Sequence, residues 1–118
     1  MVKDLDDKLF KEKIFNYEEG QDAPLMINKN TIIEFWVSWC THCKAMIPRY
    51  EEVSKKFANI NCYRVEIEQH PHIAKLFNID SYPTFVFITK HGKKEKFVGE
   101  VNEKELTHMV KEIFGEKD

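Results

Sequence analysis

Two cysteines separated by two residues are the side chains of this sequence best suited to chemistry. They are Cys40 and Cys43, in the segment WCTHC. A thiol attacks only as its thiolate, so a catalytic cysteine needs a pKa lowered from about 8.5 towards neutrality. If a strand ends near Ser38 and a helix begins near Thr41, free backbone N–H groups and the helix dipole would stabilise a negative sulfur on Cys40. Cys43, one turn inside that helix, could then resolve a mixed disulfide.

Two ionisable residues close to the cysteines could tune their reactivity. His42, between them, could offer a hydrogen bond or a positive charge to a Cys40 thiolate, which would make the disulfide more oxidising. Glu34 is the single charged residue of the run TIIEFWV. Burial there would raise its pKa and let it accept the proton that Cys43 must lose before attacking. The simpler alternatives are a solvated turn for His42 and a strand edge open to water for Glu34.

Metal binding is the competing chemistry for these thiols. Zinc generally takes four ligands, and Cys40, Cys43, Cys62 and one histidine could in principle supply them. The chain has three cysteines without a second close pair, and His70 and His72 have the spacing of a turn. We therefore expect no metal site, and we expect Cys62 to be a small core residue.

Length, charge and composition restrict the class of protein. The 118 residues match a single domain, residues 1–118, large enough to bury roughly two thirds of its unfolded surface. The net charge of −2 gives no indication of nucleic-acid binding, and no stretch approaches the ~20 apolar residues of a membrane span. The acidic first residues lack the pattern of an export signal. We expect a cytoplasmic monomer with neither nucleic acid nor membrane as a partner, where reducing conditions favour a catalytic cysteine pair.

The elements that must position the candidate residues alternate along the chain. Apolar spacing predicts helices over 4–17, 41–57, 71–77 and 102–114. Continuous apolar runs predict strands over 31–38 and 61–67, followed by a hairpin over 84–98. Asn102 and Glu105 have the spacing of a capping box, and Gly115 is placed to end the last helix. This order indicates an α/β fold with a parallel strand pair.

Three separated segments resemble the thioredoxin family. FWVSWCTHCKAMIP, SYPTFVF and FVGEVNEKEL match, in order and spacing, the active-site, proline-loop and C-terminal segments of thioredoxins. The resemblance implies a thioredoxin fold, with a central mixed β-sheet flanked by helices on both faces. It also implies that Tyr82-Pro83 is a cis peptide facing the cysteines, an isomer that is nearly confined to proline.

The same resemblance implies a function. It is that of a thiol-disulfide oxidoreductase that reduces protein disulfides through the Cys40/Cys43 dithiol, with no bound cofactor beyond this redox-active pair. Its partners would be disulfide-containing client proteins and a thioredoxin-reductase-like electron donor. Clients would pair as extended chains with the backbone at the proline loop. The client-binding surface would consist of six residues: Trp39, Thr41, Tyr82, Pro83, Val98 and Gly99.

Four positions depart from the thioredoxin pattern. Thr41-His42 stands where thioredoxins typically have Gly-Pro, and Glu34 stands where they usually have aspartate; both features are similar to protein disulfide isomerases. We therefore expect a reduction potential above the value of about −270 mV for thioredoxin. Tyr82 is bulkier than the usual residue before this proline, so client choice should also differ. Two alternatives remain open: an exported or luminal oxidase or isomerase whose signal peptide was removed, and a binding module with incidental thiols.

Overall fold

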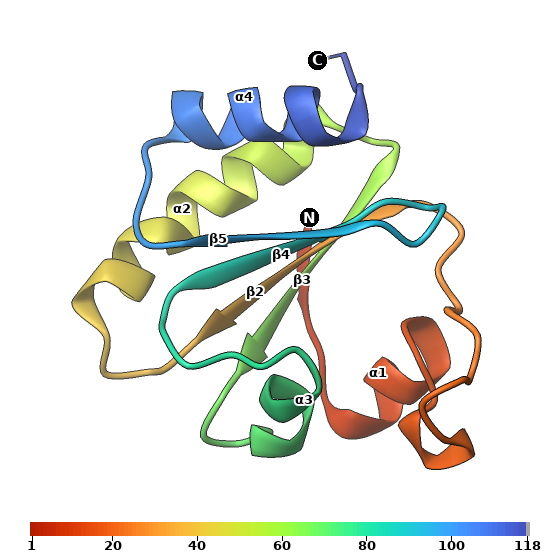
Figure 1. The fold of residues 1–118 in the computed structure, drawn as a ribbon. Helices are drawn as coiled ribbons and strands as arrows, with labels where there is room; N and C mark the ends of the chain where they lie inside the picture. The colour runs from red at the N-terminus through yellow and green to blue at the C-terminus, as the bar shows by residue number, and fades with distance from the viewer. Residues whose placement is uncertain (118) are drawn as a thin grey trace.

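The chain forms one mixed sheet with helices on both faces, as expected (Figure 1). The structure is a computed structural model, and it describes residues 1–117. The strands are β1 (Val2–Asp4), β2 (Asn30–Trp36), β3 (Ile60–Glu66), β4 (Thr84–Ile88) and β5 (Lys94–Val98). The helices are α1 (Asp7–Lys13), α2 (Thr41–Lys56), α3 (Pro71–Leu76) and α4 (Glu103–Phe114), with a short 3₁₀ turn at Tyr17–Glu19.

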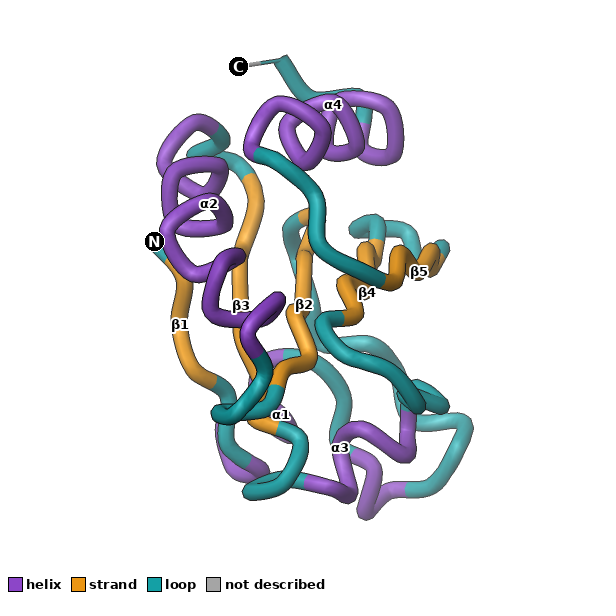
Figure 2. The backbone as a smooth tube through the Cα atoms, turned by 90° about the vertical axis from the view of Figure 1, so that its left-hand side faces the viewer, coloured by secondary structure: helices purple, strands orange, loops and turns teal. Residues whose placement is uncertain are grey.

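Strand β2 lies at the centre of the sheet, whose strand order is β1-β3-β2-β4-β5. It pairs parallel with β3 and antiparallel with β4. The outer strand β1 pairs parallel with β3, and the other outer strand, β5, pairs antiparallel with β4. Because helices cover both faces (Figure 2), nearly every residue of β2 is buried, which explains why most of its side chains are apolar.

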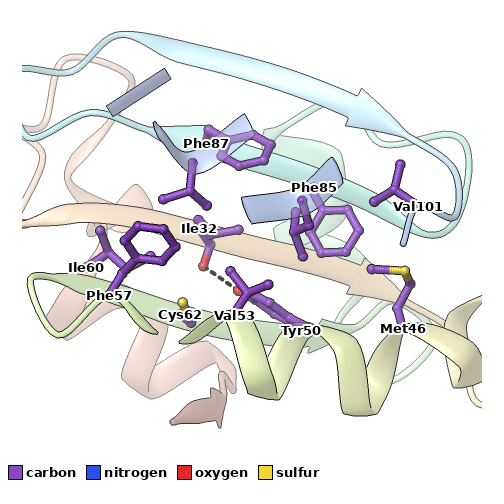
Figure 3. Packing of buried hydrophobic residues seen from close by; sticks show 12 residues of the cluster. Ile32, Met46, Tyr50, Val53, Phe57, Ile60, Cys62, Phe85, Phe87 and Val101 are labelled. Carbon is purple, nitrogen blue, oxygen red and sulfur yellow. Dashed lines mark hydrogen bonds between the residues drawn. The ribbon is translucent and has the colours of Figure 1, made fainter. Parts of the chain in front are cut away.

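Two layers of core lie on the two faces of the sheet. Helices α2 and α4 cover one face, and α1 and α3 cover the other (Figure 2). Successive residues of β2 point to opposite faces, so Ile32 packs on the α2 side whereas Ile33 and Phe35 pack on the α1 side. On the α2 side, the single O–H of Tyr50 is shared between the carbonyls of Ile32 and Tyr63, at 3.1 and 2.9 Å. Figure 3 shows the contact with Ile32.

The prediction of one helix over 4–17 is wrong at both ends, because α1 ends at Lys13 and Tyr17 begins the 3₁₀ turn. Residues Val2–Asp4 form strand β1, which pairs in register with Cys62–Arg64 of β3. The helix begins only after Asp6, whose side chain caps it by accepting from the Leu9 N–H at 2.7 Å. Apolar spacing within the segment cannot show a backbone pairing with a strand about sixty residues away.

The other elements agree with the sequence prediction to within a few residues. The largest difference at the site is that β2 ends at Trp36 and not at Ser38. The last helix is capped as expected, since the Asn102 side chain accepts from the Glu105 N–H at 2.8 Å. Gly115 ends it with a left-handed φ of 69°. No helix within residues 1–117 combines the length and apolar character needed to cross a bilayer.

Candidate active site

Cys40 occupies the N-cap position of α2, at the end of the sheet where β2 stops. The turn that leads there is closed by a backbone hydrogen bond from Cys40 N–H to the Val37 carbonyl at 3.2 Å. The Cys40 sulfur accepts a hydrogen bond from the backbone N–H of Cys43 at 3.1 Å. The sulfur therefore takes the place of the oxygen that usually caps a helix, and the positive end of the helix dipole lies beside it.

Cys43 lies one turn further into α2 and is more deeply buried than Cys40. The exposed fraction is 1% for Cys43 and 6% for Cys40. Both thiols are free, so the structure represents the reduced dithiol. Burial, and then the hydrogen bond with Cys40, raise the pKa of Cys43 to about 12. Cys43 therefore stays protonated at neutral pH and needs a proton acceptor before it can attack.

Glu34 is buried in β2, on the α2 side of the sheet, as expected for a doubly covered strand. Its side chain is fully inaccessible and is paired with Arg64 of β3, whose Nε donates to Oε1 at 3.1 Å. No described residue donates to the other oxygen, Oε2. Burial raises the pKa of Glu34 to about 7, against the opposing charge and hydrogen bond of Arg64. A carboxyl group with this pKa can take up and release a proton near neutral pH.

The electrostatic influence of Glu34 extends to Cys43, because its negative charge is one of the smaller contributions to the raised pKa of that thiol. Arg64 is held by aromatic contacts as well as by the ion pair. Its guanidinium carbon lies 5.7 Å from the ring centroid of Trp36 and 6.0 Å from that of Tyr50. The carboxylate therefore lies in an environment without access to solvent, near enough to Cys43 for its charge to affect that thiol.

His42 contacts a carboxylate on another element. Its Nδ1 lies 2.7 Å from Oε1 of Glu100, in the connection between β5 and α4. Arg49 of α2 donates from Nη1 to Oε2 of the same carboxylate at 2.7 Å, and to the Val101 carbonyl at 2.9 Å. A groove of about 640 Å³ lies here, and its lining includes His42, Glu100 and the proline loop.

The predicted client-binding residues contact one another across separate segments of the chain. Tyr82-Pro83 is a cis peptide, as the family resemblance implies. The rings of Trp39 and Tyr82 meet edge to face with centroids 5.2 Å apart, and 58% and 40% of these two residues is exposed. Val98 is also exposed, and the Gly99 N–H donates to the Pro83 carbonyl at 2.8 Å.

Thr41 is exposed as the first residue of α2, directly beside Cys40. Gly99 has a φ of +114°, a conformation that residues with a side chain rarely adopt. The structure therefore brings predicted client residues from three separated segments together, with Pro83 itself buried beneath the exposed ones.

Cys62 lies away from the dithiol. It is buried in the core on the α2 side, whereas Cys40 and Cys43 belong to a separate small cluster with Val37. Burial raises the pKa of Cys62 to about 12, which makes it an inert core thiol, as expected. In the part of the chain that the structure describes, no three His, Cys, Asp or Glu side chains lie close enough together to hold a metal ion.

Sequence reasoning missed Arg64, Arg49 and Glu100. Arg64 is the one charged residue between Ile60 and Val65 of its strand, and its position in this otherwise uncharged run could have indicated a specific partner. Its partner follows from the register, which places it directly opposite Glu34. No local pattern marks Glu100 as the partner of His42, because 58 positions separate them.

Comparison with known proteins agrees with the geometry. Residues 2–112 match the family model described as Thioredoxin. The thioredoxin of Borreliella burgdorferi is 31% identical over 116 residues, which cover 98% of this chain and 99% of that protein. Thioredoxin H5 of Arabidopsis thaliana is 32% identical over 84 residues, which cover 68% of this chain and 71% of the relative.

Solved structures show the same architecture. The reduced thioredoxin pre-protein of Schistosoma mansoni superposes with a TM-score of 0.72 at 26% identity, covering 96% of this chain and 98% of that one. Chloroplastic thioredoxin z has a TM-score of 0.77 at 16% identity over 95% of this chain and 93% of its own, which supports the fold alone. The chain therefore belongs to the thioredoxin family, and with its Cys40–Cys43 pair it is a dithiol oxidoreductase that reduces protein disulfides.

Proposed function

We propose that Cys40 is the attacking nucleophile of this reductase. Its sulfur carries out the first exchange as a thiolate, forming a bond to one sulfur of the client disulfide and breaking the client S–S bond. One client sulfur leaves as a thiolate, and a mixed disulfide with Cys40 remains. The observation that supports this role is the position of the sulfur at the α2 N-cap, where the Cys43 N–H donates to it.

Cys43 completes the reaction with Glu34 as its proton acceptor. Glu34 takes the thiol proton, and the Cys43 thiolate attacks the Cys40 sulfur, forming the intramolecular disulfide and releasing the second client thiolate. Two electrons pass to the client, and its thiolates take up one proton from Cys43 through Glu34 and one from solvent. The pKa values of about 12 for Cys43 and about 7 for Glu34 support the need for such a base.

Clients dock on the exposed surface around the dithiol. The backbone at Tyr82-Pro83 pairs with an extended client segment, and Trp39, Thr41 and Val98 contact its side chains, with Gly99 leaving room for the client backbone. The exposure of Trp39, Tyr82 and Val98 supports this surface, since large apolar residues gathered beside a reactive group commonly mark an interaction site.

The remaining parts of the proposal concern the setting of the reaction. The chain works as a single domain, residues 1–118, and as a cytoplasmic monomer that needs no bound cofactor. A thioredoxin-reductase-like protein returns it to the dithiol state, and neither nucleic acid nor a membrane takes part. The nearly balanced net charge of −2 supports transient contact with varied protein clients.

The roles of the two cysteines are tested by turnover of a protein disulfide such as that of insulin. We expect Cys40→Ser to abolish turnover, because it removes the nucleophile. We expect Cys43→Ser to accumulate a mixed disulfide with the client, detected as a covalent adduct by mass spectrometry. Undiminished turnover by Cys40→Ser would refute the assignment, and an adduct on Cys43 in the wild-type protein would reverse the two roles.

His42 favours a second candidate, an exported or luminal disulfide oxidase or isomerase. A positive imidazole beside the attacking sulfur would stabilise the reduced form and make the couple more oxidising. Equilibration with glutathione measures this directly. We expect a potential above about −270 mV, and a value at or below it would refute both this alternative and the role given to His42.

A further inference from the structure

The link between His42 and Glu100 ties the start of the active-site helix to the β5–α4 connection. Figure 1 shows this connection passing beside the first half of α2. Glu100 is well fixed, because Arg49 holds its second oxygen and also donates to the Val101 carbonyl next to it. The side chain of Glu100 is 30% exposed, whereas that of His42 is 73% exposed. The more rigid partner therefore determines where the imidazole lies.

The proton on His42 is fixed by the same contact. An ionised carboxylate can only accept hydrogen bonds, so the Nδ1 atom 2.7 Å from Oε1 must carry hydrogen and donate. The hydrogen bonds from His42 and then Arg49 lower the pKa of Glu100, which keeps its carboxyl group ionised at neutral pH. A neutral imidazole has one N–H, and here that N–H is directed at Glu100. Its other nitrogen, Nε2, is then an acceptor and cannot donate to a thiolate.

We propose that Glu100 is a positioning residue that holds His42 in the groove beside Tyr82-Pro83 and limits its stabilisation of the reduced Cys40 sulfur. The inference rests on the proposed influence of His42 on Cys40. Glu100 accepts a hydrogen bond from the single N–H of the neutral imidazole. When the imidazole is protonated, the negative charge of Glu100 offsets its positive charge. The dithiol is therefore more strongly reducing than a histidine between its cysteines would otherwise make it.

The test is the redox equilibrium of the Glu100→Gln variant with glutathione at pH 7. In this reaction the Cys40–Cys43 disulfide and two glutathione thiols give the dithiol and one glutathione disulfide. The substitution keeps the side chain's shape and removes its charge, so the hydrogen bond that holds His42 is weakened and the imidazole turns towards the sulfur more readily. We expect the equilibrium constant to shift about two- to fivefold towards the reduced protein, the range for exposed charge interactions.

A double-mutant cycle separates positioning from a general effect of charge. In a His42→Ala background, Glu100→Gln should leave the equilibrium constant unchanged, because no imidazole remains to be released. Glu105→Gln is the matched control, since Glu105 lines the same groove and contributes the same charge. We expect Glu105→Gln to leave the equilibrium unchanged.

Two outcomes would overturn the proposal. The first is an unchanged equilibrium constant for Glu100→Gln, and the second is an equal shift with and without His42. Both are independent of the cysteine assignments, because the glutathione equilibrium is measured without a protein client. Failure of the nucleophile assignment would appear instead as turnover by Cys40→Ser.

Discussion

Replacing Glu34 with glutamine should stabilise the reduced protein by an amount that grows with pH. Burial raises the pKa of this carboxyl group from an ordinary value of 4.5 to about 7, so the folded state favours the protonated form. For such a group the contribution to folding is complete below pH 4.5 and is lost as pH rises through 7. A shift of this size corresponds to about 3 kcal/mol. Glutamine imitates the protonated carboxyl group at every pH.

The expected gain in unfolding free energy is about 1 kcal/mol at pH 5 and about 3 kcal/mol at pH 9. Urea unfolding of the reduced wild-type and Glu34→Gln proteins, measured at several pH values between these limits, provides the comparison. Groups that titrate identically in both proteins cancel in the difference. Glu95→Gln is the control, because Glu95 is exposed on β5 and should show no such trend.

The reasoning is refuted if the stability difference is the same at pH 5 and pH 9, or if the wild type is the more stable protein at pH 9. The same substitution should slow turnover, by about 100-fold, since it removes the proton acceptor for Cys43. A variant that gains stability and loses activity would show that the buried carboxylate is kept for chemistry and not for folding.

Further substitutions test the neighbouring features. Arg64→Met leaves the Glu34 carboxylate buried without its partner and should lower the free energy of unfolding in urea by about 3 kcal/mol at pH 8. The loss should be smaller at pH 5, where the carboxyl group is protonated. An equal loss at both pH values would contradict the role of the ion pair. Wild-type turnover should fall as pH drops through about 7, following protonation of Glu34, and a flat profile in this range would argue against a base of that pKa. Cys62→Ala should leave turnover unchanged and cost about 1 kcal/mol through the lost core contacts, whereas a large loss of turnover would indicate a third redox thiol. Asn102→Ala removes the cap that accepts from the Glu105 N–H and should cost about 1 kcal/mol by thermal or urea unfolding, and no loss would mean that the cap is dispensable.

Local sequence patterns were sufficient for much of the fold and for the centre of the site. The run over residues 31–38 predicted a buried strand, and the spacing after Thr41 predicted the helix that Cys40 caps. Both depend on residues close together in the chain. The position of Glu34 in an apolar run was likewise enough to predict its burial, because strands covered on both faces rarely contain charged residues without a specific role.

Such local patterns could not predict which residues pair when they lie far apart in the sequence. Strand β1 was not predicted, and its last residue, Asp4, was assigned to a helix, since the three residues become a strand only through their hydrogen bonds to β3. The partner of Glu34 depends on the register of β2 against β3, which places Arg64 opposite it. A shift of one residue would direct Arg64 to the other face of the sheet.

The sequence by itself determined which atoms can react: two thiols in the right spacing, a carboxyl group behind them and a family pattern around them. Only the tertiary structure decided how those atoms are controlled. Arg64 moderates the pKa of Glu34 across 30 residues of chain, and Glu100 holds His42 across 58. The physical reason is that proton affinity and side-chain orientation depend on distances in space and on burial, and both arise only when the sheet and helices pack together.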